Sequence, residues 1–177
     1  MNASHALDVS FRETQRFTQT WLWLVIALIV AMGWWAFIQQ IFLGCPFGNR
    51  PASDPVVFVV WALCGFGLPL LLMSCRLITE VRGDGLHVRF LPFHVRWRSF
   101  AFDQISSCEA RTYHPVLEYG GWGIRCGLHG SAYNVRGNRG VQLTFSNGKR
   151  LLIGSQLAEE LALAIKSGMD RVGRRRG

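Results

Sequence analysis

Two long apolar runs stand out in the first half of the chain. Residues 21–43 and residues 55–75 contain no charged side chain, and a helix needs about 20 apolar residues to cross a bilayer. In hydrocarbon every backbone amide must be paired within its own segment, which favours a helix for both runs. Trp21 and Trp23 lie at one end of the first run, where interfacial aromatic residues are common. We therefore predict two membrane-spanning helices.

The connection between the two runs predicts a hairpin. Residues 44–54 are short and rich in turn residues, so the helices should be antiparallel and both chain ends should lie on one side. Residues 76–177 contain 16 basic and 8 acidic residues, which accounts for the whole net charge of +8. Because Lys and Arg mark the cytoplasmic ends of membrane helices, we expect both termini in the cytoplasm and the 44–54 loop outside.

The pattern changes to short alternating runs from Leu77 onward. Leu86, Val88 and Phe90 alternate with polar residues, as in a half-buried strand. About seven short strands of this kind follow up to residue 153, the density of a small β-sandwich or barrel. Between residues 95 and 102 the apolar phase changes, so we expect a bulge near Ser99.

Turn and capping residues predict the remaining local structure. Asn147-Gly148 between two alternating runs predicts a hairpin in which both residues take positive φ. A C-terminal helix is expected to begin after Ser155 as N-cap and to end at Gly168. Its apolar stripe consists of Leu157, Leu161, Ala164 and Ile165. Ser10 and Glu13 have the spacing of a capping box, which predicts a short helix starting at Phe11.

These elements define a domain organisation. It comprises a cytoplasmic N-terminal segment 1–20, a hairpin 21–75 with spans 21–43 and 55–75, a β-domain 76–168 and a disordered basic tail 169–177. The expected fold class is a membrane-anchored α+β protein, in which a seven-stranded β-sandwich or barrel follows the helical hairpin and is capped by the C-terminal helix.

Composition narrows the possible chemistry. Half of the residues (50 %) are hydrophobic and only 17 % are charged, compared with about 25 % in a typical soluble domain. This composition excludes a disordered chain. The five cysteines include no CxxC pair, and Cys126 with His129 is only half of a zinc-ligand spacing. We therefore expect no metal site and no cofactor.

Enzyme motifs are missing from the sequence. It contains no GxSxG, HExxH, P-loop or GxGxxG pattern, and no nucleic-acid-binding motif accompanies its basic charge. His114 and Glu118 are spaced as an acid–base pair without a nucleophile. We therefore expect a non-enzymatic protein with no catalytic residues and no nucleic-acid partner.

Several short segments together resemble a family of small bacterial membrane proteins. These segments are 11–13, 15–17, 39–40, 46–49, 118–125, 132–135, 137–141 and 151–156. Members of that family have two N-terminal membrane helices and a C-terminal pleckstrin-homology-like (PH-like) domain, and their function is unknown. The resemblance implies a location in the bacterial cytoplasmic (inner) membrane. It does not imply phosphoinositide binding, because Gly83-Asp84-Gly85 is too short and too acidic for the usual pocket.

Two functional hypotheses remain open. In the first, the tethered domain binds a membrane or cytoplasmic protein as a scaffold or accessory subunit, through Tyr119, Trp122, Arg125, Tyr133 and Arg139. In the second, its basic surface binds anionic lipid headgroups through Arg96, Arg98, Lys149, Arg150, Arg174, Arg175 and Arg176. Salt separates them, because screening with a Debye length of about 8 Å weakens the lipid contact more than an aromatic interface.

Overall fold

The computed structural model describes residues 9–46, 48, 51–127 and 130–176, with the side chains of 175 and 176 left out. The chain divides into two units. One contains residues 17–74 and is helical, and the other combines the N-terminal segment up to Arg16 with residues 75–177. The N-terminal segment thus folds with the domain that follows the helices.

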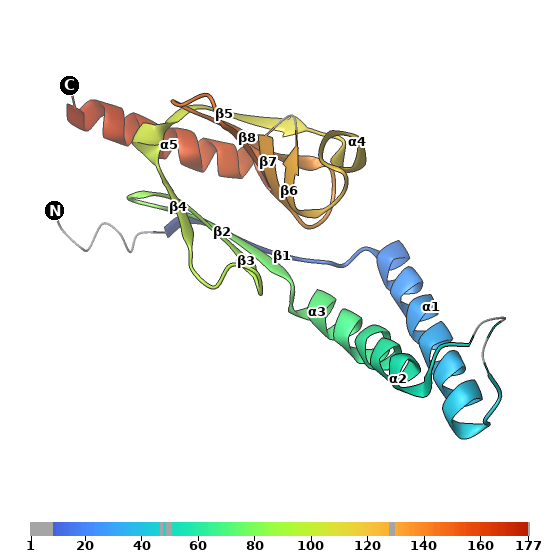
Figure 1. The fold of residues 1–177 in the computed structure, drawn as a ribbon. Coiled ribbons are helices and arrows are strands. Elements are labelled where there is room, and N and C mark those ends of the chain that lie inside the picture. Colours follow the sequence, from blue (N-terminus) through green and yellow to red (C-terminus); the bar gives the residue numbers. More distant parts are fainter. Residues whose placement is uncertain (1–8, 47, 49–50, 128–129, 177) are drawn as a thin grey trace. The chain divides into compact units, whose positions relative to one another are not determined.

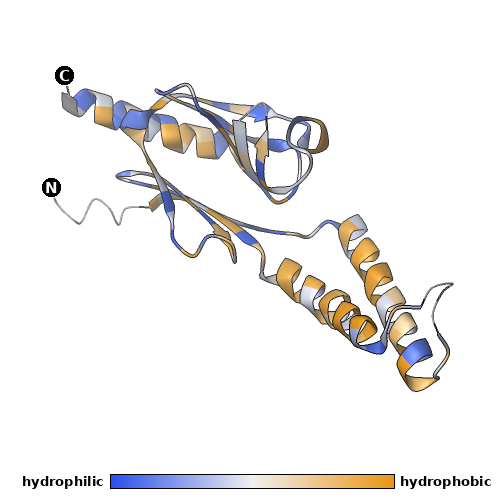
Figure 2. Ribbon diagram, in the orientation of Figure 1, coloured by the Kyte–Doolittle hydropathy of each residue, from blue (hydrophilic) through white to orange (hydrophobic). Residues whose placement is uncertain are grey.

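The helical unit follows the two apolar runs closely (Figure 1). The first run forms α1 (Thr20–Phe37) and continues as a π-helical turn, Ile38–Phe42. The second forms α2 (Asp54–Ala62), a π-helical turn (Leu63–Gly67) and α3 (Leu68–Ser74). Both helices are long and apolar enough to cross a membrane, by length and composition alone, and Figure 2 shows them mostly in hydrophobic colours.

Aromatic side chains hold the two helices of this unit together. The Phe37 and Trp61 rings are stacked with centroids 4.2 Å apart, and Trp34 meets Trp61 edge-on at 5.1 Å. Gln40, at the end of the first helix, donates to the carbonyl oxygen of Ala52 and to Oδ1 of Asp54 at 2.7 and 2.8 Å. The hairpin is therefore fastened by ring packing and by a hydrogen-bonded polar end.

The first sheet of the domain contains a strand that the sequence pattern did not predict. Its order is β1-β2-β3-β4, formed by Val9–Arg16, Arg76–Arg82, Gly85–Leu91 and Arg98–Ala101. The expected helix at Phe11 is wrong, because this segment pairs antiparallel with β2. Phe11 and Gln15 are buried against the domain, so a distant partner overrides the local capping-box signal.

The bulge expected near Ser99 is also wrong. Residues Arg98–Ala101 pair with Gly85–Val88 without a shift in register. The change of phase arises because residues 92–97 form a loop before the strand begins, so Val95 and Trp97 lie outside the ladder.

The second sheet has five strands in the order β5-β8-β9-β7-β6. They are Ile105–Thr112, Arg139–Phe145, Arg150–Gly154, Gly130–Asn134 and Gly123–Gly127. Strands β7 and β9 are parallel, and the other pairs are antiparallel. The described residues therefore form nine strands in two open sheets, rather than the expected seven-stranded sandwich or barrel.

The β8–β9 hairpin is confirmed, but its turn differs from the expected type. Only Gly148 takes a positive φ, at 79°. The Gly148 amide donates to the Phe145 carbonyl oxygen at 2.9 Å. The Phe145 amide donates to the Lys149 carbonyl oxygen, also at 2.9 Å. This is a longer turn with one left-handed glycine, which places Lys149 beside the sheet.

The C-terminal helix α5 (Ala158–Arg176) differs from the prediction at both ends. Ser155 is not its N-cap: the Ser155 hydroxyl accepts the Leu157 amide and donates to the Glu13 carboxylate before the helix begins. Gly168 does not end the helix, which continues to Arg176. Because Gly168 has no side chain, the Phe102 ring packs directly against the helix backbone at this position. The expected disordered tail is therefore helical through Arg176.

The core of the domain lies where α5 meets the two sheets. Leu161 and Ile165 of α5 are fully buried, whereas Leu157 is 43 % exposed. The helix contacts β5 and β8 of the second sheet and β1, β2 and β3 of the first. A short 3-10 turn (Phe102–Gln104) and helix α4 (Pro115–Tyr119) complete the domain. Gly120 ends α4 in the left-handed conformation that glycine tolerates best.

Candidate functional site

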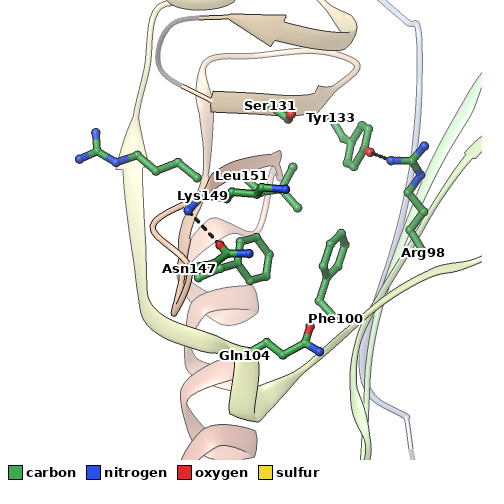
Figure 3. A pocket seen from close by; sticks show the side chains of 10 residues that line it. Arg98, Phe100, Gln104, Ser131, Tyr133, Asn147, Lys149 and Leu151 are labelled. Atoms are coloured by element: carbon green, nitrogen blue, oxygen red, sulfur yellow. Dashed lines mark hydrogen bonds between the residues drawn. The ribbon is translucent and has the colours of Figure 1, made fainter.

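A pocket between the two sheets of the domain is the candidate site (Figure 3). It has a volume of about 320 Å³ and is bounded by β4 on one side and by β7, β9 and the β8–β9 turn on the other. Its lining consists of Arg98, Phe100, Gln104, Ser131, Tyr133, Phe145, Asn147, Lys149, Arg150 and Leu151. We call it the basic pocket.

The basic pocket gathers positive charge without a carboxylate. Its ten lining residues include Arg98, Lys149 and Arg150 but no Asp or Glu. None of these three cations takes part in the ion pairs found among the described residues. Figure 3 shows Arg98 and Lys149 approaching from opposite sides. An anion between them would meet two donors without displacing an internal carboxylate.

Tyr133 fixes the position of one of these cations. Arg98 Nη1 donates to the Tyr133 hydroxyl oxygen at 2.8 Å. Burial raises the pKa of Tyr133 above its ordinary value, although Arg98 acts in the opposite direction. The phenol therefore stays protonated at neutral pH, and its O–H remains a donor while its oxygen accepts from Arg98.

Aromatic and neutral polar groups complete the lining. The rings of Phe100 and Phe145 lie 5.3 Å apart and supply an apolar wall. Asn147 holds the turn in place, since its Oδ1 accepts the Lys149 backbone amide at 3.0 Å. The pocket can therefore bind a small group that has an anionic part and an apolar or polyhydroxy part.

The comparisons with known proteins identify the family but no activity. Residues 4–172 match the model of a family of unknown function, DUF6141. The chain belongs to this family. No curated protein gives a significant match. The resemblance seen in the sequence likewise implied no function.

The residues expected to bind lipid are only partly brought together. Arg98, Lys149 and Arg150 share the basic pocket, and Arg96 is exposed in the neighbouring 92–97 loop. Arg174 is exposed on α5, and for Arg175 and Arg176 only the backbone is described. Arg150 also borders a second pocket, described below.

The residues expected to bind a protein partner lie in different places. Tyr119 and Tyr133 are buried, at 5 % and 4 % exposure, and Tyr133 belongs to the basic pocket. Trp122 is half-buried, and its Nε1 donates to the Gly137 carbonyl oxygen. Arg125 is exposed beside it, and its Nε donates to the Trp122 carbonyl oxygen at 3.0 Å. Arg139 is paired with Glu159. This set therefore does not form one aromatic face.

A second pocket of about 490 Å³ lies on the other side of the five-stranded sheet. Its lining is Glu109, Arg111, Glu118, Gln142, Thr144 and Arg150. Arg111 Nη2 bonds Glu118 Oε2 at 2.6 Å, so much of its charge is neutralised internally. Glu118 also accepts the backbone amide of His114 at 2.7 Å. The carboxylate proposed as an acid–base partner of His114 thus fastens the start of α4 and binds Arg111.

A hydrogen-bonded chain that the sequence pattern did not reveal lies on the first sheet. Ser99 Oγ is 2.8 Å from His87 Nδ1, and His87 Nε2 is 2.9 Å from Asp84 Oδ1. His87 is only 6 % exposed, so both ring nitrogens need partners. Strand register alone would have revealed the Ser99–His87 pair, because these two residues lie opposite each other on β4 and β3.

His129, which with Cys126 has half of a zinc-ligand spacing, lies outside the described residues. Among the residues that the structure does describe, no three His, Cys, Asp or Glu side chains gather as a metal site.

Proposed function

We propose that the chain is a non-enzymatic membrane protein whose cytoplasmic domain binds anionic phospholipid headgroups in the basic pocket. The observation that carries this proposal is the convergence of Arg98 and Lys149 on one cavity without a lining carboxylate. Two β-sheets followed by a closing C-terminal helix support a PH-like interpretation of the domain. The resemblance seen in the sequence supports the bacterial cytoplasmic membrane as its location.

Burial supports the membrane-spanning part of the proposal. Only 11 % and 6 % of the residues in the most apolar windows of the two helices are buried within the chain. A core helix of a soluble protein would bury its apolar side chains, because water penalises exposed hydrocarbon by about 25 cal/mol per Å². Lipid removes that penalty, and the continuous helices satisfy the backbone internally.

The sheet supports placing both flanks of the hairpin on one side of the membrane. Strand β1 precedes the first apolar helix and β2 follows the second, yet the two strands pair over their whole length. A cleaved signal sequence would remove β1 together with the contacts of Glu13 and Gln15. Both flanks therefore belong to one domain on one side, and the basic charge favours the cytoplasmic side.

Phospholipid headgroups fit the chemistry of the pocket. A phosphodiester carries one negative charge and accepts hydrogen bonds from Arg, Lys and phenol donors, the groups that Arg98, Lys149 and Tyr133 present. Each cation near an anionic membrane contributes about 1 kcal/mol. Tethering raises the effective headgroup concentration, so a modest intrinsic affinity is sufficient.

Native mass spectrometry of the delipidated full-length protein in a neutral detergent tests this proposal. We expect one phosphatidylglycerol per chain to bind in preference to phosphatidylcholine. The double variant Arg98→Gln/Lys149→Gln should lose at least about tenfold in affinity, because a hydrogen bond to a charged group contributes about 1.5–3 kcal/mol.

The matched control removes the same charges elsewhere. The double variant Lys166→Gln/Arg171→Gln changes two exposed cations of α5 and should bind phosphatidylglycerol as the wild type does. Equal losses in the two double variants would mean that net charge, rather than the basic pocket, attracts the lipid. Equal binding of phosphatidylcholine and phosphatidylglycerol would remove the proposal.

A protein partner is a second candidate, supported by one observation. Val116 and Leu117 of α4 are 60 % and 84 % exposed, and α4 contacts β6, which follows Trp122 and carries Arg125. In vivo cross-linking followed by mass spectrometry tests this candidate. A stoichiometric partner that is lost in Trp122→Ala and Leu117→Ala and survives high salt would favour protein binding.

A further inference from the structure

The strand register places one loop at the end of the first sheet that is joined to the apolar helices. Arg16 pairs with Arg76, and Arg76 pairs with Leu91, so the three residues share one end of the sheet. Three residues separate Arg16 from α1, and one residue separates Arg76 from α3. We call this the tethered end. Residues 92–97, the 92–97 loop, leave the sheet at Leu91.

The 92–97 loop exposes two large apolar side chains. Phe93 is 59 % exposed and Val95 is 75 % exposed. Water disfavours both, because transfer of apolar surface out of water is favourable. Single exposed apolar residues are normal, but here two flank one inward-facing residue in a loop at the tethered end.

Contacts within the domain hold this loop in place. The His94 amide donates to the Phe90 carbonyl oxygen at 2.7 Å, and Arg89 Nε donates to the His94 carbonyl oxygen at 3.4 Å. The His94 ring meets the Tyr133 ring edge-on, with centroids 5.4 Å apart. Because His94 is directed inward, its two neighbours Phe93 and Val95 are presented outward.

The charge around the loop has one sign. Arg16 and Arg96 are exposed and Arg76 is half-buried, and none of the three is in the ion pairs found among described residues. No Asp or Glu occurs in residues 16–19, 75–77 or 91–98. Apolar side chains among cations match the boundary between anionic headgroups and acyl chains.

We infer that the 92–97 loop inserts Phe93 and Val95 into the cytoplasmic leaflet while Arg96 contacts lipid phosphates. The inference rests on the proposed membrane attachment. It is independent of binding in the basic pocket, although His94 links the loop to Tyr133 of that pocket. Interfacial amphipathic segments bury their apolar face about 5–10 Å into the boundary between headgroups and acyl chains. The loop would then be a third membrane contact, in addition to the two spans.

Spin-label accessibility in lipid nanodiscs tests the insertion on the full-length protein. The five native cysteines are replaced by Ala, and circular dichroism first verifies that the fold is kept. Labels are then attached in Phe93→Cys, Val95→Cys and Gly83→Cys. Position 83 lies in the β2–β3 turn at the opposite end of the same sheet and is the matched control. The nanodiscs contain phosphatidylcholine with phosphatidylglycerol.

Insertion predicts opposite changes for two relaxation agents. At positions 93 and 95, collisions with a water-soluble nickel chelate should fall several-fold relative to position 83, and collisions with oxygen should rise. Equal chelate accessibility at all three positions would overturn the inference. Arg96→Gln should reduce the protection at position 95, whereas Lys166→Gln, at an exposed position of α5, should leave it unchanged.

A second measurement separates failure of this inference from failure of the proposed function. The double variant Phe93→Ser/Val95→Ser is titrated with phosphatidylglycerol in detergent, where no bilayer is present. If the double variant binds phosphatidylglycerol with the affinity of the wild type and the labels at positions 93 and 95 are accessible to the chelate, loop insertion is contradicted and the basic pocket stays supported. Protected labels without phosphatidylglycerol binding by the wild type would support insertion and remove the pocket. Release of the wild type by alkaline carbonate would remove the membrane attachment on which both proposals rest.

Discussion

Two residues of the domain, Gly168 and Tyr113, have properties that depend on how they are packed. Gly168 is buried in the middle of α5, where a side chain would overlap the ring of Phe102, itself only 3 % exposed. Glycine weakens an exposed helix by about 1 kcal/mol relative to alanine, so its presence here needs the ring contact as a reason. Tyr113 is fully buried, and burial raises the pKa of its phenol.

Gly168→Ala should destabilise the domain although it improves helix propensity. The added methyl group must displace the Phe102 ring, and overpacking costs about 1–3 kcal/mol, compared with about 1 kcal/mol gained from propensity. We expect the free energy of unfolding to fall by about 1 kcal/mol in urea titrations followed by circular dichroism. Gly173→Ala, whose added methyl group meets no heavy atom within 4 Å, should stabilise the same helix. A stabilised Gly168→Ala would contradict the ring contact.

Tyr113 should make the domain sensitive to alkaline pH. Burial raises its pKa to about 12 from the ordinary value of 10.0. Because the unfolded chain loses this proton at lower pH than the folded domain, the stabilising contribution is complete below pH 10.0 and is lost as the pH rises towards 12. Tyr113→Phe should therefore lose less stability than the wild type over this range. Parallel urea titrations at several pH values measure this difference, and identical slopes would contradict it.

At the scale of elements, local patterns predicted segments better than their partners. The alternation of Leu86, Val88 and Phe90 was sufficient for β3, because all three side chains are buried in the core, although His87 on the other face is buried as well. Strand β1 was missed because distant contacts define it. It pairs with β2 beyond the apolar helices, and its Glu13 contacts Ser155, 142 positions away. A capping-box spacing relates residues three positions apart, so it does not indicate a contact with a distant segment.

Glu13→Ala should weaken the attachment of β1 to the start of α5. The Glu13 carboxylate accepts from the Ser155 hydroxyl at 2.6 Å and from the Gln156 amide at 3.0 Å. Ser155 is fully buried, so its hydroxyl would lose its acceptor. We expect about 1–3 kcal/mol of lost stability in urea titrations. Glu160→Ala, at an exposed position of α5, should stay within about 0.5 kcal/mol of the wild type.

At the scale of the whole molecule, the apolar hairpin is an insertion between two paired strands of one sheet. Residues before and after it contribute β1 and β2 to the same domain. The N-terminal segment therefore belongs to the same domain as the basic residues from Arg76 onward. The proposed topology follows from that pairing together with the charge.

Two native cysteines report this topology. Cys45 in the hairpin loop and Cys126 in β6 are both exposed. In spheroplasts, a membrane-impermeant maleimide should label the wild type through Cys45, and Cys45→Ala should remove that labelling. Cys126→Ala should have no effect until the membrane is permeabilised. Labelling of Cys126 in intact spheroplasts would contradict the cytoplasmic placement of the domain.

The sequence by itself determined the two apolar helices, most of the strands and the existence of the closing helix. These features depend on periodicity and length, which are properties of neighbouring residues. Only the tertiary structure decided that β7 and β9 are parallel, that β1 joins the first sheet, and that Arg98 meets Tyr133 opposite Lys149. Such contacts join residues far apart in the chain, and neither the charge nor the alternation of a segment specifies which distant segment it will face.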